Sequence, residues 1–70
     1  MDEFELGQHP FIELCDLLKL LGWCSSGGMA KSLIAAGEVR VDGEVELRKR
    51  CKIRDGQVVA LHDDQITIRA

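Results

Sequence analysis

The sequence predicts an α+β fold in which two helices precede a small antiparallel sheet. Apolar residues recur at three- and four-residue steps before Gly37, as in amphipathic helices, and alternate with polar residues after it, as in strands. The composition suits one folded unit, because 46% of the 70 residues are hydrophobic and a chain of this length is too short for two domains. We therefore expect a single domain over residues 1–70, with its core at about residues 10–62.

The first helix is predicted over residues 11–21. Pro10 suits its first turn, where the missing N–H costs no hydrogen bond, and Gly22 supplies a left-handed residue just after its end. The apolar positions that define the helix are Phe11, Leu14, Leu17, Leu18 and Leu21. They share one face, which indicates a helix with one buried side.

A second helix of about ten residues is predicted to follow Ser25 or Ser26, either of which can act as its N-cap, and to end at Gly37. Its apolar face contains Ala30, Leu33 and Ile34. A helix this short is marginal alone in water, so its stability has to come from packing against the first helix and the segments that follow.

The strands are predicted from alternating apolar and polar residues and from tight turns between them. They lie at residues 39–41, 45–47, 58–61 and 66–68, with turns at Asp42-Gly43 and Asp55-Gly56. This order places the whole predicted sheet after the helices.

Charge is unevenly distributed along the chain. The net charge is −3, which by itself argues against a polyanionic partner. Residues 1–16 contain five acidic and no basic residues, whereas residues 31–54 contain seven basic and four acidic residues. The middle of the chain is therefore the segment suited to bind an anion.

A run of basic residues spans positions 48–54. If the run is extended, its four even-numbered residues point to one side and follow a phosphate backbone over roughly 20 Å, while two odd-numbered residues face the core. The outward set is Arg48, Arg50, Lys52 and Arg54, and the inward set is Cys51 and Ile53. A solvated face, or charges that protect an exposed edge strand, is the ordinary alternative.

The start of the second helix is another candidate for phosphate binding. Its unpaired N–H groups, two glycines that allow close approach and a lysine one turn further on suit an anion. The residues are Ser26, Gly27, Gly28 and Lys31. The same pattern also fits a flexible turn, and it lacks the spacing of the phosphate loop of nucleotide hydrolases.

No metal, cofactor or catalytic motif is predicted. Cys15, Cys24 and Cys51 cannot all pair within one chain and form no CxxC motif, which favours a reducing, cytoplasmic location. His9 and His62 have no ligand-like spacing to the cysteines. The sequence shows no basic leader, no apolar stretch long enough to cross a membrane, and no motif combining an acid, a base and a nucleophile. It therefore indicates neither a membrane protein nor an enzyme.

Several of these features occur together in one order. They run from Leu14, Leu17-Leu18-Lys19 and Gly22 through Ser26-Gly27-Gly28-Met29-Ala30-Lys31 and Ile34 to Gly37-Glu38-Val39-Arg40-Val41-Asp42-Gly43-Glu44. This pattern resembles the RNA-binding domain first described in ribosomal small-subunit protein four, the S-four domain, and more narrowly the small free-standing bacterial proteins of the YbcJ type. The resemblance covers nearly the whole chain and is densest over residues 14–54.

The resemblance implies the α-L arrangement, a helix-turn-helix pair on a small antiparallel sheet, which binds structured RNA of the rRNA or tRNA class. It places the RNA-binding residues at Ser26, Gly27, Gly28, Lys31, Arg48, Lys49, Arg50 and Lys52. The chain departs from the family where Phe11-Ile12-Glu13 replaces a common Arg-Leu-Asp triplet, which weakens the case for an RNA contact there. We expect Trp23 to pack at the helix corner rather than to stack on a base.

Two other classes of protein fit parts of the sequence. A sulfur carrier with a ubiquitin-like sheet has a similar length and hairpin, but it needs a C-terminal Gly-Gly, and this chain ends Thr67-Ile68-Arg69-Ala70. A protein-interaction module that docks an acidic partner through the basic segment, on the ribosome or elsewhere, stays open. For the RNA-binding interpretation we expect a monomer, with the ribosome or its precursor among the candidate partners.

Overall fold

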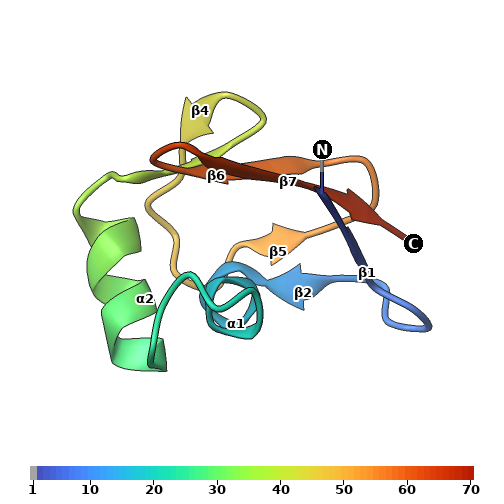
Figure 1. Ribbon diagram of the computed structural model, residues 1–70, viewed down its shortest axis with the longest axis horizontal. Coiled ribbons are helices and arrows are strands. Elements are labelled where there is room, and N and C mark those ends of the chain that lie inside the picture. Colours follow the sequence, from blue (N-terminus) through green and yellow to red (C-terminus); the bar gives the residue numbers. More distant parts are fainter. Residues whose placement is uncertain (1) are drawn as a thin grey trace.

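The structure, a computed structural model, describes residues 2–70 and confirms the predicted α+β class. The elements in chain order are β1 (Asp2–Glu5), β2 (Ile12–Glu13), α1 (Leu14–Leu20), α2 (Gly27–Ala35), β3 (Val39–Val41), β4 (Glu44–Val45), β5 (Lys52–Ile53), β6 (Val58–Leu61) and β7 (Asp64–Arg69). Figure 1 shows the strands β6 and β7 above both helices and above the strands β2 and β5.

The main sheet has five strands in the order β1-β7-β6-β3-β4, and β2 pairs with β5 in a separate antiparallel ribbon. Neighbours in the main sheet are antiparallel except β1 and β7, which run parallel with Asp2 opposite Ile66 and Glu5 opposite Arg69. The acidic start of the chain is therefore an edge strand beside the last strand, which corrects the expectation that the whole sheet follows the helices.

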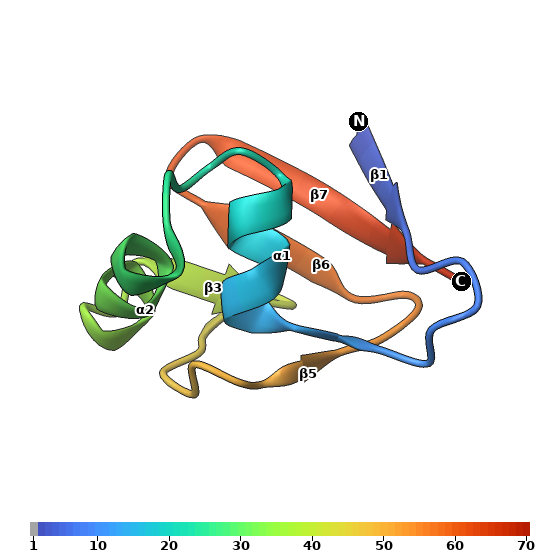
Figure 2. The ribbon, with the colours of Figure 1, turned by 90° about the horizontal axis from the view of Figure 1, so that it is seen from below.

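The core lies between the main sheet and α1. Figure 2, seen from below, shows α1 crossing in front of the sheet, with α2 next to β3. The helix contributes Leu14, Leu17 and Leu18, all fully buried, and the sheet contributes Val39, Val59 and Ile68. Burial of such side chains, at roughly 1.5–3 kcal/mol each, is what holds the helix on the sheet.

The buried cluster extends beyond residues 10–62, the core expected from the sequence. Leu6, Ile66 and Ile68 belong to it, although they lie outside residues 10–62. Each of them is in or directly beside the β1–β7 pair, so the extension of the core follows from that pairing.

The first helix begins at Leu14 and not at Phe11 as predicted. Ile12 and Glu13 are extended and pair with Ile53 and Lys52, so Pro10 lies outside the helix. The spacing of the apolar residues could not reveal this, because it does not distinguish the first turn of a helix from a short extended segment that leads into it. The predicted end is confirmed, since Gly22 has a φ of +77° just after the helix.

The second helix and the turn of the first hairpin match their predictions, whereas the strand expected at residues 45–47 is β4 at Glu44–Val45. Ser26 is the N-cap of α2, and its Oγ accepts a hydrogen bond from the Met29 N–H at 3.2 Å. In the hairpin turn, Asp42 and Gly43 have φ values of +53° and +85°, the left-handed pair that a two-residue turn between twisted strands requires. Trp23 is half-buried and packs against the core, as expected.

Candidate functional site

The basic run is a loop followed by a short strand. A turn occupies residues 49–50, and only Lys52–Ile53 pairs as β5. The prediction that four cations line up along one extended strand is therefore wrong. Cys51 and Ile53 are buried, as predicted. We name residues 48–52 the basic loop.

The loop turns because its backbone caps α1. Glu13, the N-cap residue, makes no side-chain hydrogen bond to the helix. Instead, the Leu14 N–H donates to the Cys51 carbonyl at 2.9 Å, and the Cys15 N–H donates to the Lys49 carbonyl at 3.1 Å. In an extended strand, carbonyls two residues apart are separated by roughly 6.6 Å, too far to reach adjacent N–H groups at one helix end. The backbone of this loop therefore cannot cap the helix in this way and also run as a straight strand.

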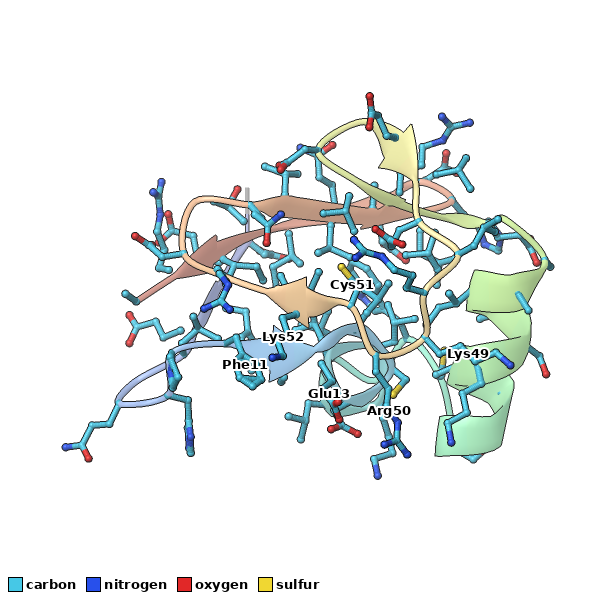
Figure 3. The ribbon with its side chains drawn as sticks, turned by 180° about the vertical axis from the view of Figure 1, so that it is seen from behind. Phe11, Glu13, Lys49, Arg50, Cys51 and Lys52 are labelled. Carbon is cyan, nitrogen blue, oxygen red and sulfur yellow. The ribbon has the colours of Figure 1, made fainter. Side chains whose placement is uncertain are left out.

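Lys49 and Arg50 occupy the tip of this turn. Both side chains are exposed, and Figure 3 shows them pointing away from the sheet, toward the end of the molecule where α2 begins. Within residues 2–70, neither forms an ion pair with an acidic side chain. Their charges are therefore available to an external anion.

Arg48, by contrast, is held by Glu46. The Glu46 carboxylate accepts hydrogen bonds from Nε and Nη2 of Arg48 at 3.0 and 3.1 Å and from the Arg48 backbone N–H at 3.0 Å. Hydrogen bonds from the Arg48 side chain and backbone lower the pKa of Glu46 to about 2. Glu46 was not among the predicted site residues, and its only signal in the sequence is an acidic residue two positions before the basic run.

Two further cations lie over the ring of Phe11. Nζ of Lys52 is 5.0 Å and Cζ of Arg54 is 5.4 Å from the ring centroid, both within the range of a cation–π interaction. Figure 3 shows Phe11 and Lys52 close together beside β5. Phe11 was predicted to begin the first helix. Instead, its ring contacts Lys52 and Arg54 at the end of the basic run.

A hollow of about 500 Å³ opens on the basic loop. Its lining residues are Arg48, Arg50, Cys51 and Lys52. Three of these four residues are cationic and none is acidic. Arg48 is paired with Glu46, but Arg50 and Lys52 form no ion pair within residues 2–70, so the potential inside the hollow favours an anion. We name it the basic hollow.

The start of α2 has the open donors that the sequence predicted. Within residues 2–70, the N–H groups of Gly27 and Gly28 have no acceptor, while Ser26 is occupied as the N-cap. A Cβ on Gly27 would meet nothing within 4 Å, and one on Gly28 would meet only Ser26 Oγ at 3.9 Å. Neither glycine is thus required by packing. Lys31, one turn further on, is exposed.

The two predicted groups of residues lie on neighbouring segments. In both ribbon views the chain leading into the basic loop runs alongside α2 (Figures 1 and 2). Leu47 approaches the end of α2, where a Cβ on Gly37 would lie 4.0 Å from Leu47 Cδ2. The helix carries Ser26, Gly27, Gly28 and Lys31, and the loop carries Arg48, Lys49, Arg50 and Lys52.

Negative charge collects around a second hollow, of about 640 Å³, formed by β1, the segment before β2, and α1. Glu5, Glu13 and Asp16 line it with one cation, Lys19, and with apolar side chains that include Phe4 and Leu20, so acidic residues outnumber basic ones. These carboxylates repel a polyanion, so an RNA or phosphate ligand is not expected on this side.

Within residues 2–70, no group of three or more His, Cys, Asp or Glu side chains is arranged to hold a metal ion. Cys15, Cys24 and Cys51 are free and buried, and burial raises the pKa of the Cys24 and Cys51 thiols. Over the same part of the chain, no helix is both long and apolar enough to cross a membrane.

Comparisons with known proteins show similarity to S4-domain proteins along nearly the whole chain. The family model of the S4 domain matches residues 4–69. The putative RNA-binding protein YbcJ of Escherichia coli K12 is 56% identical over 70 residues, which cover 100% of both chains. The uncharacterized protein YbcJ of Shigella flexneri is also 56% identical over the same full length.

A solved structure has the same fold. The solution structure of YbcJ from E. coli, described as revealing an αL motif involved in RNA binding, superposes with a TM-score of 0.77 at 56% identity. The similarity covers 100% of this chain and 89% of that chain. The predicted α-L arrangement, with two helices against a small sheet, is thereby confirmed.

Proposed function

The chain belongs to the S4-domain family, and from this premise we propose that it is a protein that binds structured RNA of the rRNA or tRNA class. The resemblance to small S-four-like proteins found in the sequence is confirmed by the full-length relatives. The relative from E. coli is itself named a putative RNA-binding protein.

The observation that carries the proposal is the basic hollow beside the two free cations. Arg48, Arg50 and Lys52 line a concave surface, and neither Arg50 nor the adjacent Lys49 has an acidic partner within residues 2–70. Affinity for nucleic acids comes largely from such cations, which neutralise phosphates and release counterions. A protein with a net charge of −3 can bind a polyanion if its bases are gathered in this way.

The start of α2 supports the same proposal from a neighbouring segment. Its N–H groups at Gly27 and Gly28 are open, and both glycines leave room for a phosphate to approach the backbone. We therefore assign RNA contacts to Ser26, Gly27, Gly28, Lys31, Arg48, Lys49, Arg50 and Lys52.

Folded RNA is the favoured class of ligand because the chain has few surfaces on which bases can stack. Phe4, Phe11 and Trp23 are all partly buried against the core or half-covered. Double-stranded and folded RNA is recognised mainly through its shape, phosphates and 2′-hydroxyl groups, for which cations and backbone donors suffice.

The proposed protein is a single-domain, cytoplasmic monomer with no cofactor and no catalytic step. Its buried free thiols suit a reducing compartment. The ribosome or its precursor is the first setting to test, because ribosomal RNA belongs to the proposed ligand class.

The test is the binding of fluorescein-labelled tRNA and of a labelled rRNA hairpin, followed by fluorescence anisotropy. Lys49→Ala combined with Arg50→Ala should weaken binding roughly 10- to 100-fold and lower the slope of log Kd against log salt by about 2. The matched control is Lys19→Ala combined with Arg40→Ala. It removes the same charge from α1 and from the exposed side of β3 and should change affinity by less than about threefold.

Equal losses in both double variants would contradict the site, because they would reflect net charge alone. If the wild-type protein binds neither RNA, the proposed function is wrong. Crosslinked complexes from cells add a further criterion: a complex that survives ribonuclease would instead indicate a protein partner.

A further inference from the structure

We infer that Glu46 is a positioning residue for RNA binding: its carboxylate fixes Arg48 as one wall of the basic hollow, so that a negative charge strengthens the binding of a negatively charged ligand. The inference rests on the proposed function and deepens it. It concerns a residue that charge counting alone would place among those opposing RNA.

The contact between Glu46 and Arg48 is a fork. The carboxylate bonds Nε at 3.0 Å through Oε2 and Nη2 at 3.1 Å through Oε1, so the guanidinium is gripped along one edge. Within residues 2–70, Nη1 of Arg48 has no acceptor, so that donor stays available. The Arg48 side chain is 77% exposed and would otherwise sample many rotamers, which costs conformational entropy when a ligand orders it. The fork removes part of that cost beforehand.

Glu46 can hold Arg48 because Glu46 is itself fixed. Its side chain is only 17% exposed, and its backbone N–H donates to the Val39 carbonyl on β3 at 3.0 Å. Beyond Arg48, the Cys51 N–H donates to the Arg48 carbonyl at 3.2 Å, and Cys51 in turn caps α1 at Leu14. The basic loop is thus tied to the sheet at one end and to the helix at the other.

Two effects of the Glu46 charge oppose each other. At a distance, the carboxylate repels RNA, but its charge is largely neutralised by Arg48 at hydrogen-bond distance, and salt screens the remainder beyond roughly 8–10 Å. At the hollow, the carboxylate decides where a charged donor points, and misplacing such a donor by about 1 Å removes most of its value. The geometric effect therefore outweighs the repulsion.

The experiment compares two variants with the same change of charge. Glu46→Gln keeps the size of the side chain but cannot accept both bonds of the fork, whereas Glu44→Gln alters an exposed residue on β4 that has no hydrogen-bonded side-chain partner within residues 2–70. With labelled tRNA at about 0.1 M salt, we expect Glu46→Gln to weaken binding about five- to tenfold. Glu44→Gln should leave the affinity unchanged or raise it by up to about twofold.

A third variant separates charge from geometry. Glu46→Asp keeps the charge but is one methylene shorter, so it should also weaken binding, and its folding can be checked by the dispersion of backbone amide signals in NMR. In an Arg48→Ala background, Glu46→Gln should no longer weaken binding, and it should raise the affinity slightly because the unpaired carboxylate then only repels RNA. The Arg48 Nε–H signal should be protected from solvent exchange in the wild type and unprotected in Glu46→Gln.

The outcomes distinguish this inference from the proposed function. If the wild type binds RNA and Glu46→Gln binds as tightly as Glu44→Gln, the positioning role is overturned and the proposed function stands. If Glu46→Gln still weakens binding when Arg48 is alanine, Glu46 does not act through Arg48, and the inference again fails. If the wild type binds no RNA, both fail together.

Discussion

The basic loop and the first turn of α2 both present positive potential, but they obtain it in different ways. In the basic loop the charge is carried by side chains at residues 48–52, whose backbone is held by hydrogen bonds to α1. At the start of α2 it is carried by the open N–H groups of Gly27 and Gly28 and by the helix dipole, with Lys31 as one exposed cation. The loop offers unit charges, and the helix offers a partial charge of about half a unit at close range.

This difference assigns the two regions separate tasks. Unit charges act over the length of ionic screening, so the loop should govern affinity and its dependence on salt. Backbone donors act only in direct contact, so the start of α2 should govern how closely and in which orientation a phosphate is seated.

Matched charge reversals give the largest expected difference between the two regions. Arg50→Glu should weaken tRNA binding roughly 100-fold, because it places a carboxylate in the basic hollow, and Lys31→Glu should weaken it roughly tenfold. Anisotropy at one salt concentration measures both, with Lys19→Glu on α1 as the control for net charge. A greater loss for Lys31→Glu would reverse the ranking of the two regions.

Alanine at both glycines separates stability from binding at the start of α2. Gly27→Ala combined with Gly28→Ala should raise the free energy of unfolding by roughly 0.5–1 kcal/mol for each change, because neither position has a positive φ and a Cβ has room. The same variant should bind RNA about fivefold more weakly, since the new methyl groups stand between a phosphate and the N–H donors. Urea unfolding and anisotropy test the pair of effects. Greater stability with unchanged affinity would leave this turn without a role in binding.

Acid should affect the basic loop and not the start of α2. Because the pKa of Glu46 lies at about 2 instead of its usual 4.5, its ionised form contributes stability that is present above about pH 4.5 and is lost as the pH falls toward 2. Glu46→Gln should be less stable than the wild type by on the order of 1 kcal/mol at pH 7, a modest value because Arg48 is exposed. Urea unfolding at pH 7 and pH 3 should show the difference shrinking in acid. A difference that stays constant with pH would mean that the ionisation of Glu46 adds nothing to stability.

The parts of the fold that were predicted correctly depend on neighbouring residues. The left-handed pair at Asp42 and Gly43, the N-cap at Ser26 and the helix end at Gly22 each involve interactions within about one turn of chain. The predicted burial of Cys51 and Ile53 is also confirmed, because it depends only on the local direction of the side chains.

The parts that failed depend on partners far away in the sequence. The pairing of β1 with β7 joins the two ends of the chain, and its strand shows only Phe4 as an apolar residue. The start of α1 shifted because Ile12 pairs with Ile53, and the basic loop turned because its carbonyls cap that same helix. The candidate site could be predicted from the charges in the sequence. The role proposed for Glu46 could not, because it depends on the shape of the loop.

Carbonyl groups of the basic loop cap the N-terminus of helix α1, so the opening of the loop also exposes the first N–H groups of the helix. The amide protons of Leu14 and Cys15 are bonded to carbonyls of the loop, so they exchange with deuterium only when the loop lifts away. Their exchange rates therefore record how often the loop opens in the free protein. A ligand that makes the loop open less often should therefore slow the exchange of both amide protons, even if it contacts neither residue.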